Sequence, residues 1–274
     1  MSTAAAMKRI GHGEDAEIFA LEDRQLVKLF YPQHAGLVDI EADITRRAQQ
    51  AGLPAPAVNR TVELDGRRGI LFKDFEEGQT LRRCVRAKPW RLMAAARTLA
   101  ELHAAIHAAR VPGLPSQRAE LARQIREASA LTGAAKDAAL ARLDRLPDAE
   151  TACHNDLHLN NVIVTSRGPV VIDWVLAAQG HPLSDVARTC LLLRLGDLPS
   201  NPVAAAALGA VRAAFERAYL ARYFTLRPGS RAEVLAWELP VAAALASRRT
   251  HPVRQGQLVD VVNQHLRRRG PHAV

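Results

Sequence analysis

Residues 153–164 read CHNDLHLNNVIV, which places two histidines, one aspartate and three asparagines directly before an apolar run typical of a buried strand. A second apolar run, PVVIDW, follows the connection SRG, and this spacing predicts a hairpin. If its strands pair, Asn161 and Asp173 lie at one mouth of the hairpin, close to Asp156. Carboxylate and amide oxygens held together suit a hard divalent ion such as Mg²⁺. Asp156 would then remain available to orient or deprotonate an incoming hydroxyl.

The same stretch matches a family pattern. HNDLHLNN fits H-x-D-x-x-x-x-N, and IDW and HPLSDVA follow it in order. Together these motifs resemble those of the aminoglycoside phosphotransferase and choline kinase family, which has a protein-kinase-like fold. By this resemblance Asp156 is the catalytic base, and Asn161 and Asp173 bind Mg²⁺. The resemblance further implies that Asp185 holds the catalytic loop by hydrogen bonds and that His154 is a packed, orienting residue.

The elements that must position these residues form an α+β pattern. The resemblance implies a bilobal protein-kinase-like fold, with a small N-terminal antiparallel-sheet lobe that carries one helix and a larger, mainly helical C-terminal lobe. We expect a nucleotide-binding lobe over residues 1–75, a hinge over 76–80, and a helical lobe with the catalytic loop and acceptor site over 81–274. Short apolar runs predict strands over 16–21, 26–30, 57–64 and 69–72, and apolar spacing predicts a helix over 37–50.

The second half of the chain changes to helical patterning. Apolar residues at helical spacing predict helices over 90–109, 182–195, 202–222, 231–247 and 253–268, with two more inside 117–146. Only NVIVT and PVVIDW are typical of strands in this half. The sequence therefore predicts a helical lobe that holds a single hairpin.

A kinase-like lobe also needs groups that contact the phosphates of the nucleotide. The run IGHGEDAEIFAL places Gly11 and Gly13 between two strands, where a backbone without Cβ can approach phosphates closely. LVKLF places Lys28 on the expected third strand, and Glu41 on the following helix is the best-placed partner for it, with Asp43 as a rival. An ordinary hairpin at the glycines and a surface position for Lys28 are the alternatives.

The expected joint supplies the remaining nucleotide contacts. Backbone groups from Lys73 to Phe75 would face the adenine edge, because the hinge of a kinase-like fold lies there. The resemblance implies ATP as the phosphate donor, with GTP left open, and Mg²⁺ as the metal.

A histidine pair and a tryptophan are expected to have structural roles. His103 and His107 lie four residues apart on an expected helix and could be a metal pair. No third ligand is recognisable in the sequence, so we interpret them as an ordinary helix face. Trp174 is expected in the core.

The composition restricts the cellular setting. The formal charge of +9 allows an anionic partner, but we favour scattered arginines on solvated helix faces as its explanation. The three cysteines, Cys84, Cys153 and Cys190, have no metal-ligand spacing and are typical of a reduced, intracellular protein. No signal peptide and no apolar stretch long enough to span a membrane are recognisable, so we expect a cytoplasmic protein without a membrane partner.

The acceptor is expected to be a hydroxyl group of a small molecule. Val175 and His181 stand where family members often carry acids, which affects the expectation for the substrate more than that for the activity. From residue 201 onward the sequence contains four acidic residues and eleven arginines. This composition is a poor match for a polycationic aminoglycoside. We therefore favour a sugar, an amino alcohol or a macrolide-like compound, while acids near Glu120 or Glu127 could still receive an aminoglycoside in antibiotic resistance.

Other functions remain open at this stage. A protein kinase is one alternative, although the short segment from Asp173 to Pro182 leaves little room for an activation loop. A nucleotide-sensing binding protein or a nucleic-acid binder is another, and HLRRRG near the end is its best support. We do not expect nucleic acid as a partner, and the sequence leaves the oligomeric state undetermined.

Overall fold

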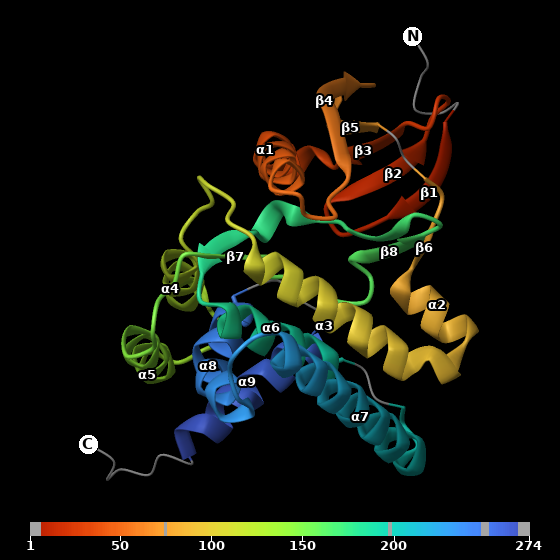
Figure 1. Ribbon diagram of the computed structural model, residues 1–274. Coiled ribbons are helices and arrows are strands. Elements are labelled where there is room, and N and C mark those ends of the chain that lie inside the picture. The colour runs from red at the N-terminus through yellow and green to blue at the C-terminus, as the bar shows by residue number, and fades with distance from the viewer. Residues whose placement is uncertain (1–6, 74–75, 197–198, 248–251, 268–274) are drawn as a thin grey trace. The chain divides into compact units, whose positions relative to one another are not determined.

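The computed structural model describes residues 7–73, 76–196, 199–247 and 252–267 (Figure 1). Its contacts group the chain into two compact units, one of Met1–Ala87 with Leu159–Ala177 and one of Lys88–His158 with Ala178–Val274. This grouping is discontinuous along the chain, whereas the lobes expected from the sequence are contiguous. Phe75, expected at the adenine edge, lies outside the described residues, and so does most of the C-terminal arginine run.

The first unit is built around an antiparallel five-stranded sheet with the strand order β1-β2-β3-β5-β4. Its strands are β1 (Lys8–His12), β2 (Ala16–Ala20), β3 (Leu26–Phe30), β4 (Ala57–Leu64) and β5 (Arg67–Lys73). Val27 and Leu29 of β3 pack with Phe19 and Leu71 on one face of the sheet. Alternation along the strands therefore gives the sheet two apolar faces.

The helix α1 (Leu37–Gln50) has the bounds predicted from the sequence and lies beside this sheet (Figure 1). Val38 and Ala42 of α1 pack against Phe30 and Ile70 of the sheet. The buried positions recur every three or four residues, so the apolar side of an amphipathic helix covers the second apolar face of the sheet. This packing also fixes which α1 side chains face β3.

A smaller sheet completes the first unit, with the order β6-β8-β9. It contains β6 (Gln79–Thr80), β8 (Val162–Thr165) and β9 (Gly168–Val171), and α2 (Leu81–Ala87) follows β6 directly. The strands β8 and β9 form the hairpin that the sequence predicted. Glu76 contacts both Ser166 and Arg167 at the turn of this hairpin, so residues distant in sequence hold its tip.

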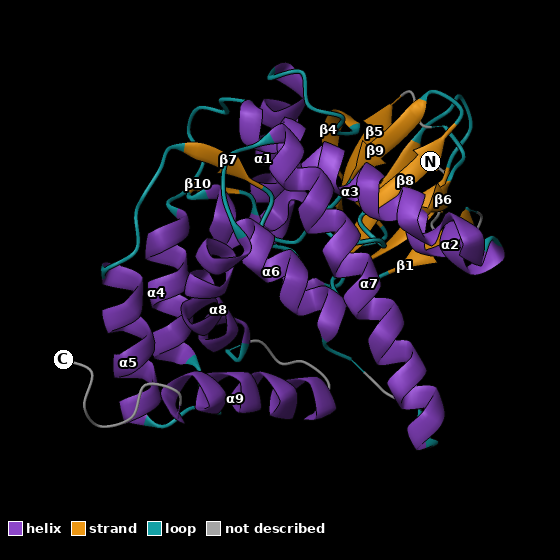
Figure 2. Ribbon diagram, turned by 60° about the horizontal axis from the view of Figure 1, so that its bottom comes forward, coloured by secondary structure: helices purple, strands orange, loops and turns teal. Residues whose placement is uncertain are grey.

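The second unit consists mainly of helices, which confirms the α+β class. They are α3 (Leu92–Ala108), α4 (Gln117–Glu127), α5 (Gly133–Asp144), α6 (Pro182–Arg194), α7 (Pro202–Leu226), α8 (Arg231–Leu245) and α9 (Pro252–Arg267). Figure 2 shows α8 enclosed among α4, α5, α6 and α9, and each of these helices contacts it. The second half of α8 is buried on all sides, which explains its nearly continuous apolar sequence.

Helix starts in the second unit follow capping rules. Ser116, Thr132, Asn201 and Ser230 each accept a backbone N–H with the side chain at the beginning of a helix. Such caps satisfy N–H groups that have no partner inside the helix. His181 does the same at α6 with its Nδ1 atom, so a histidine marks the start of the helix that carries Asp185.

One expectation about the second half of the chain was wrong. Besides the hairpin, β7 (Thr151–Cys153) and β10 (Ala178–Gly180) pair antiparallel in the second unit. Strands of three residues are too short to show an alternating pattern, so only their long-range pairing reveals them. β7 ends directly before His154, and β10 ends one residue before the cap of α6.

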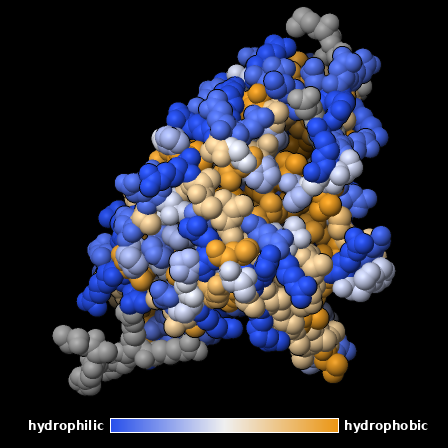
Figure 3. Space-filling view, in the orientation of Figure 1, coloured by the Kyte–Doolittle hydropathy of each residue, from blue (hydrophilic) through white to orange (hydrophobic). Residues whose placement is uncertain are grey.

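No helix in the described part of the chain is long and apolar enough to cross a membrane. Exposed apolar side chains nevertheless occur on the first turns of α7, where Val203 is 79% exposed (Figure 3, lower right). Isolated exposed apolar residues are normal on protein surfaces and carry no functional meaning alone.

Candidate active site

The ion pair expected between Lys28 and Glu41 forms in the first unit. Lys28 Nζ donates hydrogen bonds to both carboxylate oxygens of Glu41 at 2.7 Å and contacts Asp173 Oδ1 at 3.1 Å. Lys28 points from β3 toward α1, and the Glu41 side chain is only 3% exposed. The rival acid, Asp43, pairs instead with Arg47 on the exposed side of α1. The structure therefore brings one lysine between two carboxylates.

Burial and charge act in opposite directions on this pair. Burial disfavours the ammonium form of Lys28, but the attraction of Glu41 and Asp173 outweighs it and raises the pKa of Lys28. Burial also raises the pKa of Glu41 to about 7, against the attraction of Lys28 and with a contribution from Asp173. Lys28 is therefore charged at neutral pH. The carboxyl group of Glu41 loses its proton near pH 7.

The raised pKa of Glu41 predicts a pH-dependent stability. Because the folded state holds this proton up to about pH 7 and the ordinary value is 4.5, stability should fall as the pH rises through this window. The slope should reach at most about 1.4 kcal/mol per pH unit. We expect Glu41→Gln to lack this slope in urea denaturation at pH 5, 6, 7 and 8. Parallel pH profiles of the two proteins would contradict the assignment.

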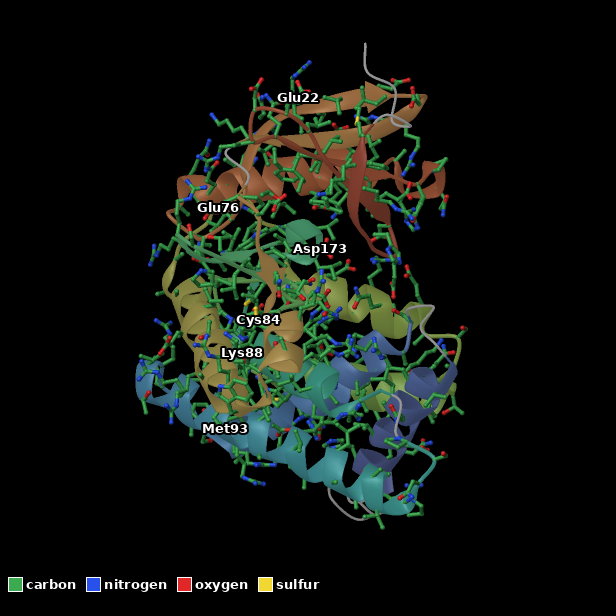
Figure 4. The ribbon with its side chains drawn as sticks, turned by 90° about the vertical axis from the view of Figure 1, so that its right-hand side faces the viewer. Glu22, Glu76, Cys84, Lys88, Met93 and Asp173 are labelled. Atoms are coloured by element: carbon green, nitrogen blue, oxygen red, sulfur yellow. The ribbon has the colours of Figure 1, made fainter. Side chains whose placement is uncertain are left out.

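The expected metal ligands flank the open end of the β8–β9 hairpin. The backbone N–H of Ile172 donates to Asn161 O at 2.9 Å, directly beyond the paired residues Val162 and Val171. Asp173, labelled in Figure 4, has a left-handed backbone with φ 68° and a side chain that is one-third exposed. The next residue, Trp174, is buried as expected and donates to Val171 O, so a core side chain fixes the position of Asp173.

The other candidate nucleotide-binding residues have different surroundings. Gly13 lies in the turn between β1 and β2 and donates its N–H to Ala16 O at 2.8 Å. Gly11 was expected in this turn as well, but it lies inside β1, opposite Ile18 and next to a bulge. The bulge between Arg9 and Gly11 shifts the pairing with β2 by one residue. The pairing continues beyond the bulge, so Gly11 belongs to β1. Lys73 is exposed at the end of β5.

The catalytic-loop residues lie in the second unit, where hydrogen bonds hold their backbone. Asp185 accepts the N–H of His154 at 2.6 Å and that of Asn155 at 3.0 Å, which confirms the anchoring role expected for it. The His154 ring is fully buried and accepts the N–H of Asp156. Thr189 donates its hydroxyl to Leu157 O at 2.8 Å. Both Asp185 and Thr189 lie on α6, so this helix mounts the loop.

The side chains of Arg188 and His158 flank the Asp156 carboxylate within the second unit. Arg188 Nη2 lies 3.6 Å from Oδ1, and His158 Nε2 lies 3.7 Å from Oδ2. The Arg188 side chain is 5% exposed and that of Asp156 is 16% exposed. A guanidinium at this distance favours the ionised form of a carboxylate, which is the form that can accept a proton. Sequence reasoning had assigned no role to Arg188.

The interpretation of His103 and His107 as an ordinary helix face was wrong. Both are buried on α3, and their Nε2 atoms lie 3.0 and 3.4 Å from one Asp185 oxygen. Their Nδ1 atoms face the hydroxyls of Tyr219 and Tyr223 at 2.5 and 2.7 Å. The sequence does carry a signal, since the two tyrosines have the same four-residue spacing as the two histidines, and α3 packs along α7.

This cluster stabilises the anion that anchors the loop. Burial alone would raise the pKa of Asp185, but its contacts with His103 and His107 hold that pKa well below its usual range. Burial lowers the pKa of His107 to about 4, so this ring is neutral at pH 7. The three ligand atoms lie within 4.8 Å of one another. Because both Nε2 atoms lie close to the Asp185 oxygen that also accepts the backbone N–H of His154, we assign the cluster to anchoring.

Comparison with protein-family profiles identifies the family of this chain. The profile of the phosphotransferase enzyme family matches residues 6–233. No curated protein matches the chain significantly in a sequence search. A thermostable mutant of aminoglycoside phosphotransferase APH(4)-Ia, in ternary complex with ADP and hygromycin B, superposes with a TM-score of 0.66 and 17% identity, covering 98% of this chain and 95% of that chain.

Two further solved structures are similar at comparable levels. A choline/ethanolamine kinase family protein from Mesorhizobium loti has a TM-score of 0.61 and 15% identity, covering 95% of this chain and 88% of that chain. The amicoumacin kinase hAmiN, in complex with AMP-PNP, Ca²⁺ and Ami, has a TM-score of 0.62 and 12% identity, covering 98% and 90%. At such identities the likeness establishes the protein-kinase-like fold.

Proposed function

Because the chain belongs to the phosphotransferase enzyme family, we propose that it transfers the γ-phosphate of ATP, with Mg²⁺, to a hydroxyl group of a small molecule. Family membership makes the protein a kinase-type enzyme, and the nucleotide, the metal and the acceptor are the proposed parts. The single observation that carries the proposal is the part-buried ammonium of Lys28 between Glu41 and Asp173. Phosphoryl transfer needs such an oriented positive charge against the phosphates of the nucleotide.

Each site residue has a role in this proposal. Asp156 accepts the proton of the acceptor hydroxyl, since Arg188 favours its ionised form. Asn161 and Asp173 offer oxygen ligands of the type that Mg²⁺ prefers, and Asp173 is exposed enough to reach an ion. A bound Mg²⁺ would neutralise negative charge on the phosphates.

The nucleotide itself contacts the first unit in this proposal. Lys28 binds its phosphates while Glu41 orients the ammonium group. The backbone at Gly13 covers the phosphates, with Gly11 beside it, and the backbone at Lys73 faces the adenine. Similar folds bound to ADP or AMP-PNP support an adenine nucleotide as the donor.

The acceptor class follows from the charges of the second unit. Glu216 and Glu238 both pair with Arg194, and Glu120 and Glu127 both pair with Arg123. Each of these acids therefore already has an ion-pair partner within the chain itself. We infer that a neutral or weakly cationic hydroxyl compound suits the protein better than a polycationic aminoglycoside.

Nucleotide binding tests the first part of the proposal. We expect Lys28→Met to raise the Kd of Mg–ATP by about 10- to 100-fold, because a hydrogen bond to a charged group contributes about 1.5–3 kcal/mol. Isothermal titration calorimetry measures this Kd. Lys88→Met is the matched control, since Lys88 is exposed and should leave the Kd unchanged (Figure 4). An unchanged Kd in Lys28→Met would contradict the role of Lys28.

A further inference from the structure

Asn155, the residue before Asp156, has an unusual backbone conformation. Its φ angle is 59°, in the left-handed region that few residue types other than glycine, asparagine and aspartate adopt readily. This turn determines the direction in which the chain enters Asp156. Asp185 holds this turn through the backbone N–H groups of His154 and Asn155. The Asn155 side chain is therefore a separate point at which the turn can be fixed.

Gln117 provides this second attachment. Its Nε2 donates to Asn155 Oδ1 at 2.7 Å, and its Oε1 accepts the N–H of His181 at 3.0 Å. Gln117 is 3% exposed, so the NH2 group and the carbonyl oxygen of its side-chain amide both find their partners within the protein. One side chain from the start of α4 thus bonds the catalytic loop and the start of α6.

The surroundings of Gln117 are built to receive it. Ser116 forms a parallel bridge with Gln179, and the N–H of Gln179 donates to Pro115 O at 2.7 Å. A Cβ atom at Gly180 would lie 2.3 Å from Gln117 Oε1 and 2.4 Å from its Cβ, far inside contact distance. Glycine at position 180 therefore leaves the space that the amide occupies.

These contacts form a closed circuit around the turn. Gln117 holds the Asn155 side chain and His181, the cap of α6, and α6 carries Asp185, which holds the backbone of the same turn. We propose that Gln117 is a positioning residue for Asp156, which fixes the left-handed turn at Asn155 through its side chain. This inference rests on the proposed function of Asp156 and adds a residue that lies outside every family motif in the sequence.

Loss of Gln117 should act on the reaction more than on nucleotide binding. The Asn155 side chain would lose its bond to Gln117, and the peptide that leads into Asp156 could rotate away from its position. A misplacement of about 1 Å in a catalytic group can reduce a rate by roughly 10²-fold. We therefore expect a lower kcat with an unchanged KM for ATP.

A double-mutant cycle tests the proposal. Gln117→Leu replaces the amide with an apolar side chain of similar size. Asn155→Gly removes the side chain that Gln117 bonds while still allowing a positive φ. We expect each single variant to lower kcat by roughly 10- to 100-fold and the double variant to be no more than about threefold worse than Gln117→Leu. Independent effects that multiply in the double variant would overturn the proposal.

A control on the same helix separates positioning from folding. Gln124 is also buried on α4, where its Nε2 bonds to Glu120 and not to the catalytic loop. We expect Gln124→Leu to lower thermal stability as much as Gln117→Leu does, yet to keep the wild-type kcat. An equal loss of kcat in both variants would reduce Gln117 to a structural residue.

Backbone hydrogen exchange gives a readout that needs no acceptor. We expect Gln117→Leu to accelerate exchange of the amides of residues 154–156 by on the order of 10-fold, because opening of the turn becomes easier. Gln124→Leu should leave these amides unchanged. If the wild-type protein transfers no phosphate, the proposed function fails, while this exchange still decides whether Gln117 holds the loop. Unchanged exchange of these amides in Gln117→Leu would overturn the proposal that Gln117 holds the turn at Asn155.

Discussion

Replacing Asp156 with asparagine is expected to reduce phosphate transfer by on the order of 10²- to 10⁴-fold, the range typical for the loss of a general base. The amide keeps the size of the side chain and leaves the hydrogen bond from its backbone N–H to His154 in place. It cannot accept the hydroxyl proton, so kcat should fall while the Kd of Mg–ATP stays within about twofold.

The matched control for this variant is Asp137→Asn, an exposed carboxylate on α5 that should leave kcat unchanged. Steady-state kinetics at saturating ATP and calorimetric ATP binding distinguish the two effects. A near-normal rate in Asp156→Asn would mean that another group accepts the proton. A large loss of ATP binding would mean that Asp156 acts on the nucleotide instead.

The second large effect is expected for Asp185→Ala. This change leaves the N–H groups of His154 and Asn155 without their acceptor and removes the anion between His103 and His107. Breaking a buried charged network from one side destabilises a protein by about 3–5 kcal/mol. Urea denaturation followed by tryptophan fluorescence, to which the buried Trp237 of the same unit contributes, measures the loss.

An exposed ion pair provides the comparison for Asp185. Asp43 and Arg47 pair along the surface of α1, and Asp43→Ala should lower stability by only about 0.3–0.5 kcal/mol. If Asp185→Ala were as mild as Asp43→Ala, the buried cluster would not be the anchor of the catalytic loop. The difference between the stability losses of the two variants thus measures how much burial strengthens the contacts of an acidic side chain.

Much of the first unit could be predicted because its signals are local. Alternating apolar residues define β2 to β5, and the register of β3 with the face of α1 is enough to bring Lys28 to Glu41. The β8–β9 hairpin also follows from two short apolar runs and a glycine-containing turn. Gly11 departed from its predicted place because a bulge in β1 has no signature in a single sequence.

The second unit contains the contacts that the sequence could not reveal. The pairing of β7 with β10 joins segments of three residues each, and the bond from Gln117 to Asn155 spans 38 positions. Neither contact depends on a repeating pattern, so nothing local announces it. The histidine cluster is intermediate, because equal spacing on α3 and α7 predicts facing pairs only once those helices are known to pack together.

The most direct measurement of the proposed function is transfer of labelled γ-phosphate from Mg–ATP to pooled hydroxyl compounds. The pools would hold sugars, amino alcohols, macrolides and aminoglycosides, with protein-only and Asp156→Asn lanes as controls. We predict Mg²⁺-dependent label on a small molecule, strongest among neutral or weakly cationic compounds and absent with Asp156→Asn. Label on the protein alone, or equal label with Asp156→Asn, would contradict a small-molecule phosphotransferase that uses Asp156 as its base.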